Sequence, residues 1–210
     1  MIDWNKYKIT ENLKTVLKEL DIEQKDEISN MFEYYLTEFR KIPINDSSVL
    51  HNPVNETIKE TIDISGDKIS CSRGCSFCCH LDVTVSELEA DSINKKIEEN
   101  NINIDLERLN RQSTVKNYSE LKYQDRRCVF LDESDSCKIY EDRPISCRKL
   151  LVTSDPDLCN TAKYTKQPVK GLLNIETEAM VSASMNIGKS GRLSTMILNE
   201  TKIKTNNYDT

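Results

Sequence analysis

The spacing of apolar residues along the first 41 positions predicts two consecutive amphipathic helices. The first stripe consists of Ile9, Leu13, Val16, Leu17 and Leu20, and the second of Ile28, Met31, Phe32, Tyr35, Leu36 and Phe39. Asp21 separates the stripes, and Pro43 ends the second helix. Residues 1–42 are therefore expected to form a helical hairpin whose apolar stripes face the core.

Residues 43–70 lack a comparable stripe and are expected to be irregular or briefly extended. In the stretch "ETIDIS", Ile62 and Ile64 alternate with polar neighbours, which is typical of a short strand. His51 lies in this polar stretch, and we expect it to face solvent and to have no functional role.

Helical patterns return after residue 82. Val83 and Val85 favour a brief extended segment, and Ser86 with Glu89 forms an S-x-x-E capping box that begins a helix over residues 87–99. A further helix follows, with Leu106 and Leu109 predicted to face inward. Residues 100–125 are polar and are expected to space two cysteine-containing blocks.

Short helices and loops are predicted for the second half of the chain. "DRP" at residues 142–144 is typical of a helix start one turn before Cys147, and "SDPDLC" predicts a capped short helix that carries Cys159. Apolar residues over 171–200 predict C-terminal helices interrupted by Gly188 and Gly191. The expected fold is mainly α: a single domain over residues 1–210, with helices around an irregular cysteine-rich core at 71–160.

Composition narrows the possible functions. The charged fraction is 30% and the hydrophobic fraction 37%, and 5 Gly with 5 Pro argue against a β-sandwich. The net charge of −6 provides no basic surface for nucleic acid. The first 14 residues contain no apolar signal region and no window resembles a membrane span, so we expect a cytoplasmic protein without membrane contacts.

The eight cysteines carry the chemistry, and all of them lie after residue 70. Without an export signal, such a cluster favours metal binding or redox chemistry over a disulfide framework. Cys71, Cys75 and Cys78 have the spacing C-x3-C-x2-C, so one loop offers three thiolates to a soft or borderline metal.

Cys79 directly follows Cys78, and neighbouring Cα atoms about 3.8 Å apart usually direct their side chains differently. The pair could therefore serve two centres, or one thiol could close a single site from the other side. The second block supplies the remaining candidate ligands, Cys128, Cys137, Cys147 and Cys159. Four plus four thiols allow two four-ligand sites, or one cluster with supporting thiols. For His80, a surface or capping role is favoured over metal ligation.

Two motifs together resemble a known family. "CSRGCSFCC" and "CKIYEDRPISCR" are similar to the cysteine-cluster signature of the YkgJ-type proteins, a zinc- or iron-chelating domain. The resemblance covers roughly residues 71–150. It implies bound iron–sulfur or zinc on Cys71, Cys75, Cys78, Cys79, Cys128, Cys137 and Cys147. Related cysteine runs in flagellin lysine methylases imply that such a module can accompany methyl transfer, although no methyltransferase glycine-rich loop is present here.

These observations favour a protein with an iron–sulfur cluster, of the [4Fe–4S] type, that acts as a redox or methyl-transfer-type accessory enzyme on an unidentified protein or small molecule. The alternative is a structural zinc module that mediates protein–protein interaction. Arg143 and Arg148 lie near the cysteines and could bind an anion, but satisfying helix-end carbonyls is the favoured role. A radical S-adenosylmethionine enzyme is disfavoured by the short chain after the cysteine loop, and a thiol oxidoreductase by the absence of a βαβ pattern.

Overall fold

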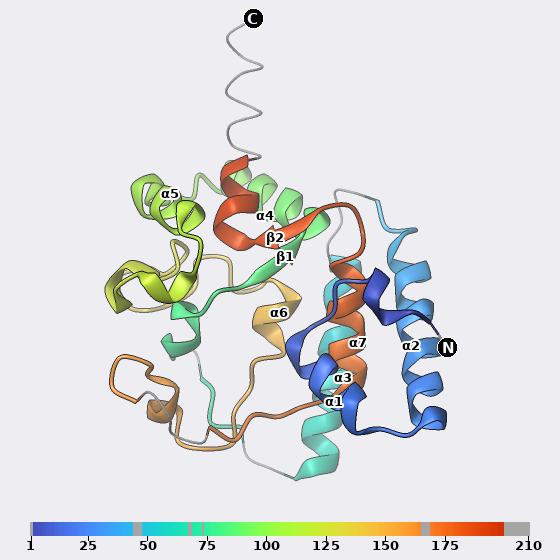
Figure 1. Cartoon of the computed structure of the whole chain (residues 1–210). Coiled ribbons are helices and arrows are strands. Elements are labelled where there is room, and N and C mark those ends of the chain that lie inside the picture. The colour runs from blue at the N-terminus through green and yellow to red at the C-terminus, as the bar shows by residue number, and fades with distance from the viewer. Residues whose placement is uncertain (1, 44–47, 67–68, 73, 165–168, 200–210) are drawn as a thin grey trace, which may run out of the picture.

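The computed structural model describes residues 2–43, 48–66, 69–72, 74–164 and 169–199. Helices dominate it, as the sequence predicts (Figure 1). The first half contains η1 (Trp4–Lys6), α1 (Glu11–Glu19), α2 (Ile22–Phe39), α3 (Ser48–Ser65), η2 (Phe77–His80), β1 (Thr84–Ser86) and α4 (Glu87–Glu99). The second half contains α5 (Leu106–Thr114), η3 (Tyr118–Glu120), η4 (Tyr123–Arg126), α6 (Ile145–Arg148), η5 (Pro156–Cys159), α7 (Ile175–Ser184) and β2 (Ser190–Arg192). Residues 193–199 are helical.

The predicted N-terminal helices are confirmed as α1 and α2. The side chain of Asp21 caps α2 by accepting from the Gln24 N–H at 2.9 Å, and the Gln24 side chain returns the bond to complete a capping box. Both helices pack on α7, which also contacts α3 (Figure 1). Because α7 is buried on nearly every side, it forms the axis of this half of the molecule.

The expectation of an irregular or extended segment over 43–70 is wrong, because most of it forms α3. Leu50 and Val54 are fully buried at helical spacing and join the same core as α2 and α7. Ile64, which suggested a strand, is 85% exposed at the end of this helix. Pro53 lies near the start of α3, where proline disrupts a helix less than it does in the centre.

The C-terminal region contains a strand that the helical pattern does not predict. β2 pairs antiparallel with β1, and Val85 lies opposite Gly191. The capping box of α4 is confirmed, whereas Leu106 is 54% exposed instead of facing inward. Residues 200–210 lie outside the described residues.

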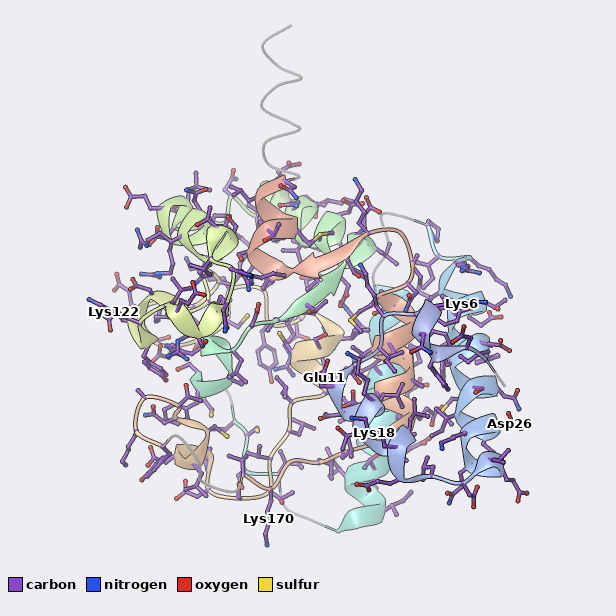
Figure 2. The ribbon with its side chains drawn as sticks, in the orientation of Figure 1. Lys6, Glu11, Lys18, Asp26, Lys122 and Lys170 are labelled. Carbon is purple, nitrogen blue, oxygen red and sulfur yellow. The ribbon has the colours of Figure 1, made fainter. Side chains whose placement is uncertain are left out.

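The described residues contain three hydrophobic clusters: two large ones, called the first and second cores here, and a small one of Leu13, Leu17 and Ile28 between α1 and α2. The first core lies between α2, α3 and α7, and the second between β1, α4, α5 and the segment around Phe130. Helix α4 joins them, since Leu88 is part of the first core and Ile93 part of the second. Charged side chains such as Lys6, Lys122 and Lys170 point outward from these cores (Figure 2).

No helix in the described ranges is both long and apolar enough to cross a membrane.

Candidate metal centre

Cysteines from two distant blocks line one cavity beside the second core. The cavity has a volume of about 170 Å³, and all eight cysteines of the chain are free thiols. Seven of them line it: Cys71, Cys75, Cys78, Cys79, Cys128, Cys137 and Cys147. The structure therefore brings both predicted cysteine blocks to one place.

The first block folds as a turn followed by a short 3-10 helix. Gly74 adopts φ +88, which glycine tolerates and other residues rarely do, and the Cys75 N–H donates to the Ser72 carbonyl at 3.0 Å. Helix η2 then carries Cys78 and Cys79 as consecutive residues. The chain reversal at Gly74 turns Cys75 toward the same cavity as the helix.

The second block is held by a tight turn between Cys128 and Cys137. Asp132 accepts backbone N–H bonds from Ser134 at 2.8 Å and from Ser136 at 2.9 Å. The Lys138 N–H donates to the Phe130 carbonyl at 2.8 Å, and Phe130 is anchored in the second core. The polar "DESDS" stretch thus brings its two flanking cysteines onto one wall.

Cys147 is positioned by a buried carboxylate in another helix. Glu89 of α4 accepts the Ile145 N–H at 2.9 Å, where α6 begins, and also accepts the Ser86 N–H at 2.9 Å and the Ser86 hydroxyl at 2.8 Å. Burial raises the pKa of Glu89 although these hydrogen bonds oppose the shift. One side chain therefore fixes the start of α4 against the start of α6.

Backbone hydrogen bonds also connect the two cysteine blocks directly. The Cys128 N–H donates to the Cys79 carbonyl at 2.8 Å, and the Val152 N–H donates to the Cys71 sulfur at 3.3 Å. The Ser70 N–H in turn donates to the Val152 carbonyl at 2.9 Å. These bonds fix the register of the blocks without depending on any bound metal.

Three thiols accept hydrogen bonds from the backbone N–H two residues further along the chain. Phe77 donates to Cys75, Phe130 to Cys128 and Ile139 to Cys137. A donated N–H stabilises the thiolate over the thiol, which is the form that binds metal. The repeated arrangement prepares sulfurs in both blocks for ligation.

Burial works against ionisation of most of these thiols. It raises the pKa of Cys128 to about 11, and it raises the pKa of Cys137 and of Cys147 as well. A buried thiolate needs a compensating positive charge, and metal ligation provides one.

The adjacent cysteines behave as one hydrogen-bonded pair. The hydrogen bond from Cys79 lowers the pKa of Cys78, and Arg143 contributes in the same direction. The shared hydrogen bond and burial raise the pKa of Cys79, and the two thiols therefore titrate as a coupled pair.

The thiols fall into two groups around Cys78. Cys128 and Cys147 interact electrostatically with each other and with both Cys79 and Cys137, whereas Cys159 interacts with Cys71 and Cys75. Cys78 acts on both groups. Cys159, on η5, does not line the cavity but lies close to the first block.

The two arginines of the "DRPISCR" stretch differ in their surroundings. Arg148 is buried and donates to the backbone carbonyls of Glu141 and, at 3.0 Å, Arg143, and it also reaches Asn55 at 3.3 Å. The favoured carbonyl-binding role is therefore correct for Arg148. Arg143 instead lies over the ring of Tyr140, 4.1 Å from its centre, and lines the cavity.

Neither histidine lines the cavity. His80 stacks on Tyr123 with ring centres 4.1 Å apart, and its Nδ1 lies 3.1 Å from the Ser76 carbonyl, as the capping role requires. The expectation that His51 faces solvent is wrong, because it is 6% exposed on α3 with its Nδ1 3.2 Å from Arg148. Its burial follows from the unpredicted α3.

The donor set fits a thiolate-bound metal group, but the positions do not converge on a single ion. Within the described ranges, no three histidine, cysteine, aspartate or glutamate side chains are placed as ligands of one metal ion. The thiols instead surround a space, which is suited to a group larger than one ion.

Comparison with known proteins identifies the cysteine-containing part of the chain. Residues 70–170, which include all eight cysteines, match a family model described as "CxxCxxCC: Putative zinc- or iron-chelating domain". No curated protein and no solved structure matches the chain. The description supports metal binding at the cluster. Residues 70–170 thus match the same kind of cysteine-cluster domain that the two sequence motifs resemble.

Proposed function

We propose that the chain holds an iron–sulfur cluster, of the [4Fe–4S] type, on its cysteines and acts as a redox or methyl-transfer-type accessory enzyme. The observation that carries the proposal is that seven thiols from two blocks line one cavity of about 170 Å³. When bound, such a cluster supplies one-electron transfer.

The number and placement of the thiols support a cluster over a single zinc ion. A structural zinc site is closed by four ligands about 2.0–2.3 Å from the metal. Here the cavity has more thiols than one zinc ion uses, and no three described ligand side chains are gathered for one ion. The N–H groups that face three of the sulfurs are the kind of contact that tunes cluster potential.

The grouping of the thiols suggests which residues would hold the cluster. Cys79, Cys128, Cys137 and Cys147 provide four thiolates, the number that a [4Fe–4S] cluster requires. Cys78 would belong with Cys71, Cys75 and Cys159, which would act as supporting thiols beside this cluster. The adjacent cysteines would therefore belong to different sets, one on each side of the shared hydrogen bond.

A structural zinc module is the second candidate function. It is favoured by the irregular backbone around the cysteines, since loops with few hydrogen-bonded elements gain most from metal crosslinks. In that case the chain would mediate protein–protein interaction. The cavity beside the thiols supports a small-molecule partner more directly than a protein partner.

Anaerobic purification followed by elemental analysis tests the proposal. We expect a brown protein with iron and acid-labile sulfide, and an electron paramagnetic resonance signal after reduction. Cys147→Ser should lose most of this iron, whereas Cys159→Ser, outside the cavity lining, should lose less. A colourless protein that contains zinc alone after anaerobic purification would refute the iron–sulfur assignment.

A further inference from the structure

One part of the cavity wall is formed by residues other than the thiols, and this part has no role in metal binding. This part is formed by Val83, Leu109, Tyr118, Leu193 and Ser194. The residues come from the region of β1, α5 and the helical turn after β2, which lie together at one end of the molecule (Figure 1). The cavity therefore has a thiol wall and a mainly apolar wall.

Two polar groups of the lining have no hydrogen-bond partner within the described residues. The Ser194 hydroxyl is one of them, and Ser194 is only 5% exposed. The second is the buried Nε of Arg143, whose guanidinium makes no described ion pair with a carboxylate, lies over the Tyr140 ring and acts electrostatically on Cys78 and Cys137. An unmade hydrogen bond at a buried polar group is costly, so such groups indicate a missing partner.

The other charged side chains of the lining are already paired. Arg192 binds both carboxylate oxygens of Asp82 at 2.9 and 3.0 Å and also donates to two backbone carbonyls. Asp135 accepts from Arg127 at 2.9 Å. Arg143 is thus the cationic group of the described lining that remains available for an anion, and a guanidinium binds carboxylates particularly well.

We propose that the cavity binds a small carboxylic acid with an apolar body next to the thiols. Arg143 binds the carboxylate, Ser194 forms a hydrogen bond to the ligand, and the apolar wall at Val83, Leu109 and Leu193 surrounds its body. The volume of about 170 Å³ is close to that of engineered cavities that admit benzene, which limits the apolar body of the ligand to about the size of one aromatic ring. This inference deepens the proposed function by naming a ligand class for the same site.

Calorimetric titration of the anaerobically purified full chain with benzoate tests the inference. Benzyl alcohol and inorganic phosphate serve as comparison ligands, because they lack the carboxylate and the apolar body respectively. Benzoate should bind and both comparison ligands should bind at least about tenfold more weakly, since one charge-assisted hydrogen bond contributes a factor of this size. Benzoate binding no tighter than benzyl alcohol or phosphate would overturn the inference.

Two variants separate ligand binding from structure. Arg143→Gln should weaken benzoate binding about tenfold or more, whereas Arg111→Gln, on the exposed side of α5, should not change it. Ser194→Ala should weaken binding severalfold while leaving the urea midpoint unchanged or higher, because it removes an unsatisfied buried hydroxyl. Unchanged benzoate affinity in Arg143→Gln, with or without loss of metal, would mean that Arg143 acts only on the thiolates and would overturn the inference.

Metal content measured on the same samples distinguishes the two proposals. A protein that contains an iron–sulfur cluster but binds no benzoate would refute the carboxylate site and leave the proposed function intact. A protein that binds benzoate through Arg143 but contains no iron would refute the iron–sulfur assignment and support the carboxylate site.

Discussion

Replacing Glu89 with glutamine tests whether one buried carboxylate positions the helix that carries Cys147. Glu89 is 2% exposed, and its two oxygens accept three hydrogen bonds, two from Ser86 and one from the Ile145 N–H. Glutamine has the same size but keeps only one acceptor oxygen. If that oxygen retains the bonds of Ser86, the buried Ile145 N–H faces an amide group that cannot accept from it.

The expected cost follows from that single unsatisfied donor. Leaving one buried donor unpaired costs about 1–3 kcal/mol, so the free energy of unfolding should fall by about this amount. For a chain of this size the melting midpoint should fall by about 2–4 °C for each kcal/mol. The start of α6 should also loosen, so Glu89→Gln should bind metal more weakly than the wild type.

Urea unfolding of the purified variants measures the change. Glu99→Gln is the matched control, because it makes the same substitution in the same helix at an exposed residue whose ion-pair distances to Lys95 and Lys96 are 3.8 and 3.4 Å. We expect the control to stay within about 0.5 kcal/mol of the wild type. Equal stability of Glu89→Gln and Glu99→Gln would refute the argument that the Ile145 N–H depends on this carboxylate.

Three further tests, with five substitutions in all, address other parts of the structure. Cys147→Ser should lower the metal content more than Cys159→Ser does, because only Cys147 lines the cavity. It should also lower the metal-dependent gain in melting midpoint more. Equal losses in the two variants would contradict the assignment of the metal to the thiols that line the cavity. Lys149→Met removes the ion-pair partner of the buried Glu178 carboxylate, which lies 2.5 Å away. In urea unfolding, the free energy of unfolding should fall by about 3–5 kcal/mol, less the part that the hydrogen bonds from Thr10 and Asn12 to Glu178 recover. Lys163→Met breaks the exposed ion pair with Asp157, at 2.7 Å, and should leave the urea midpoint unchanged. Similar midpoints in the two lysine variants would refute the argument that the buried ion pair stabilises the fold more than the exposed one. Gly74→Ala forces a side chain into φ +88 and should destabilise the cysteine turn by about 1–3 kcal/mol, and an unchanged urea midpoint would show that the turn relaxes without cost.

Local sequence signals predicted the helices whose starts are marked by a capping residue. Asp21 and Ser86 each begin a helix where the pattern expects one, because a cap acts on backbone groups only two or three residues away. α3 was missed because it has a proline near its start and polar residues around its apolar stripe. Its burial depends on contact with α2 and α7, which no local signal encodes.

The candidate site was predictable in its chemistry but not in its arrangement. The cysteine spacing indicates metal binding, and the family match agrees with it. The "DRPISCR" stretch indicates that Arg143 lies close to the thiols, but it does not indicate that the Arg143 side chain lacks a carboxylate partner. Only the packed structure shows that the guanidinium lies over the Tyr140 ring and that its buried Nε has no hydrogen-bond partner among the described residues. Ser194 gave no sequence signal at all.

The sequence alone thus determined the mainly helical fold and the thiol-based metal chemistry, because periodicity, capping residues and cysteine spacing act over a few positions. Tertiary structure decided which thiols share a cavity, that β2 pairs with β1, and which polar groups of the lining remain without partners. These properties depend on contacts between segments separated by up to about a hundred residues, such as Val85 and Gly191. Such contacts form only when the two cores are packed, so no local pattern specifies them.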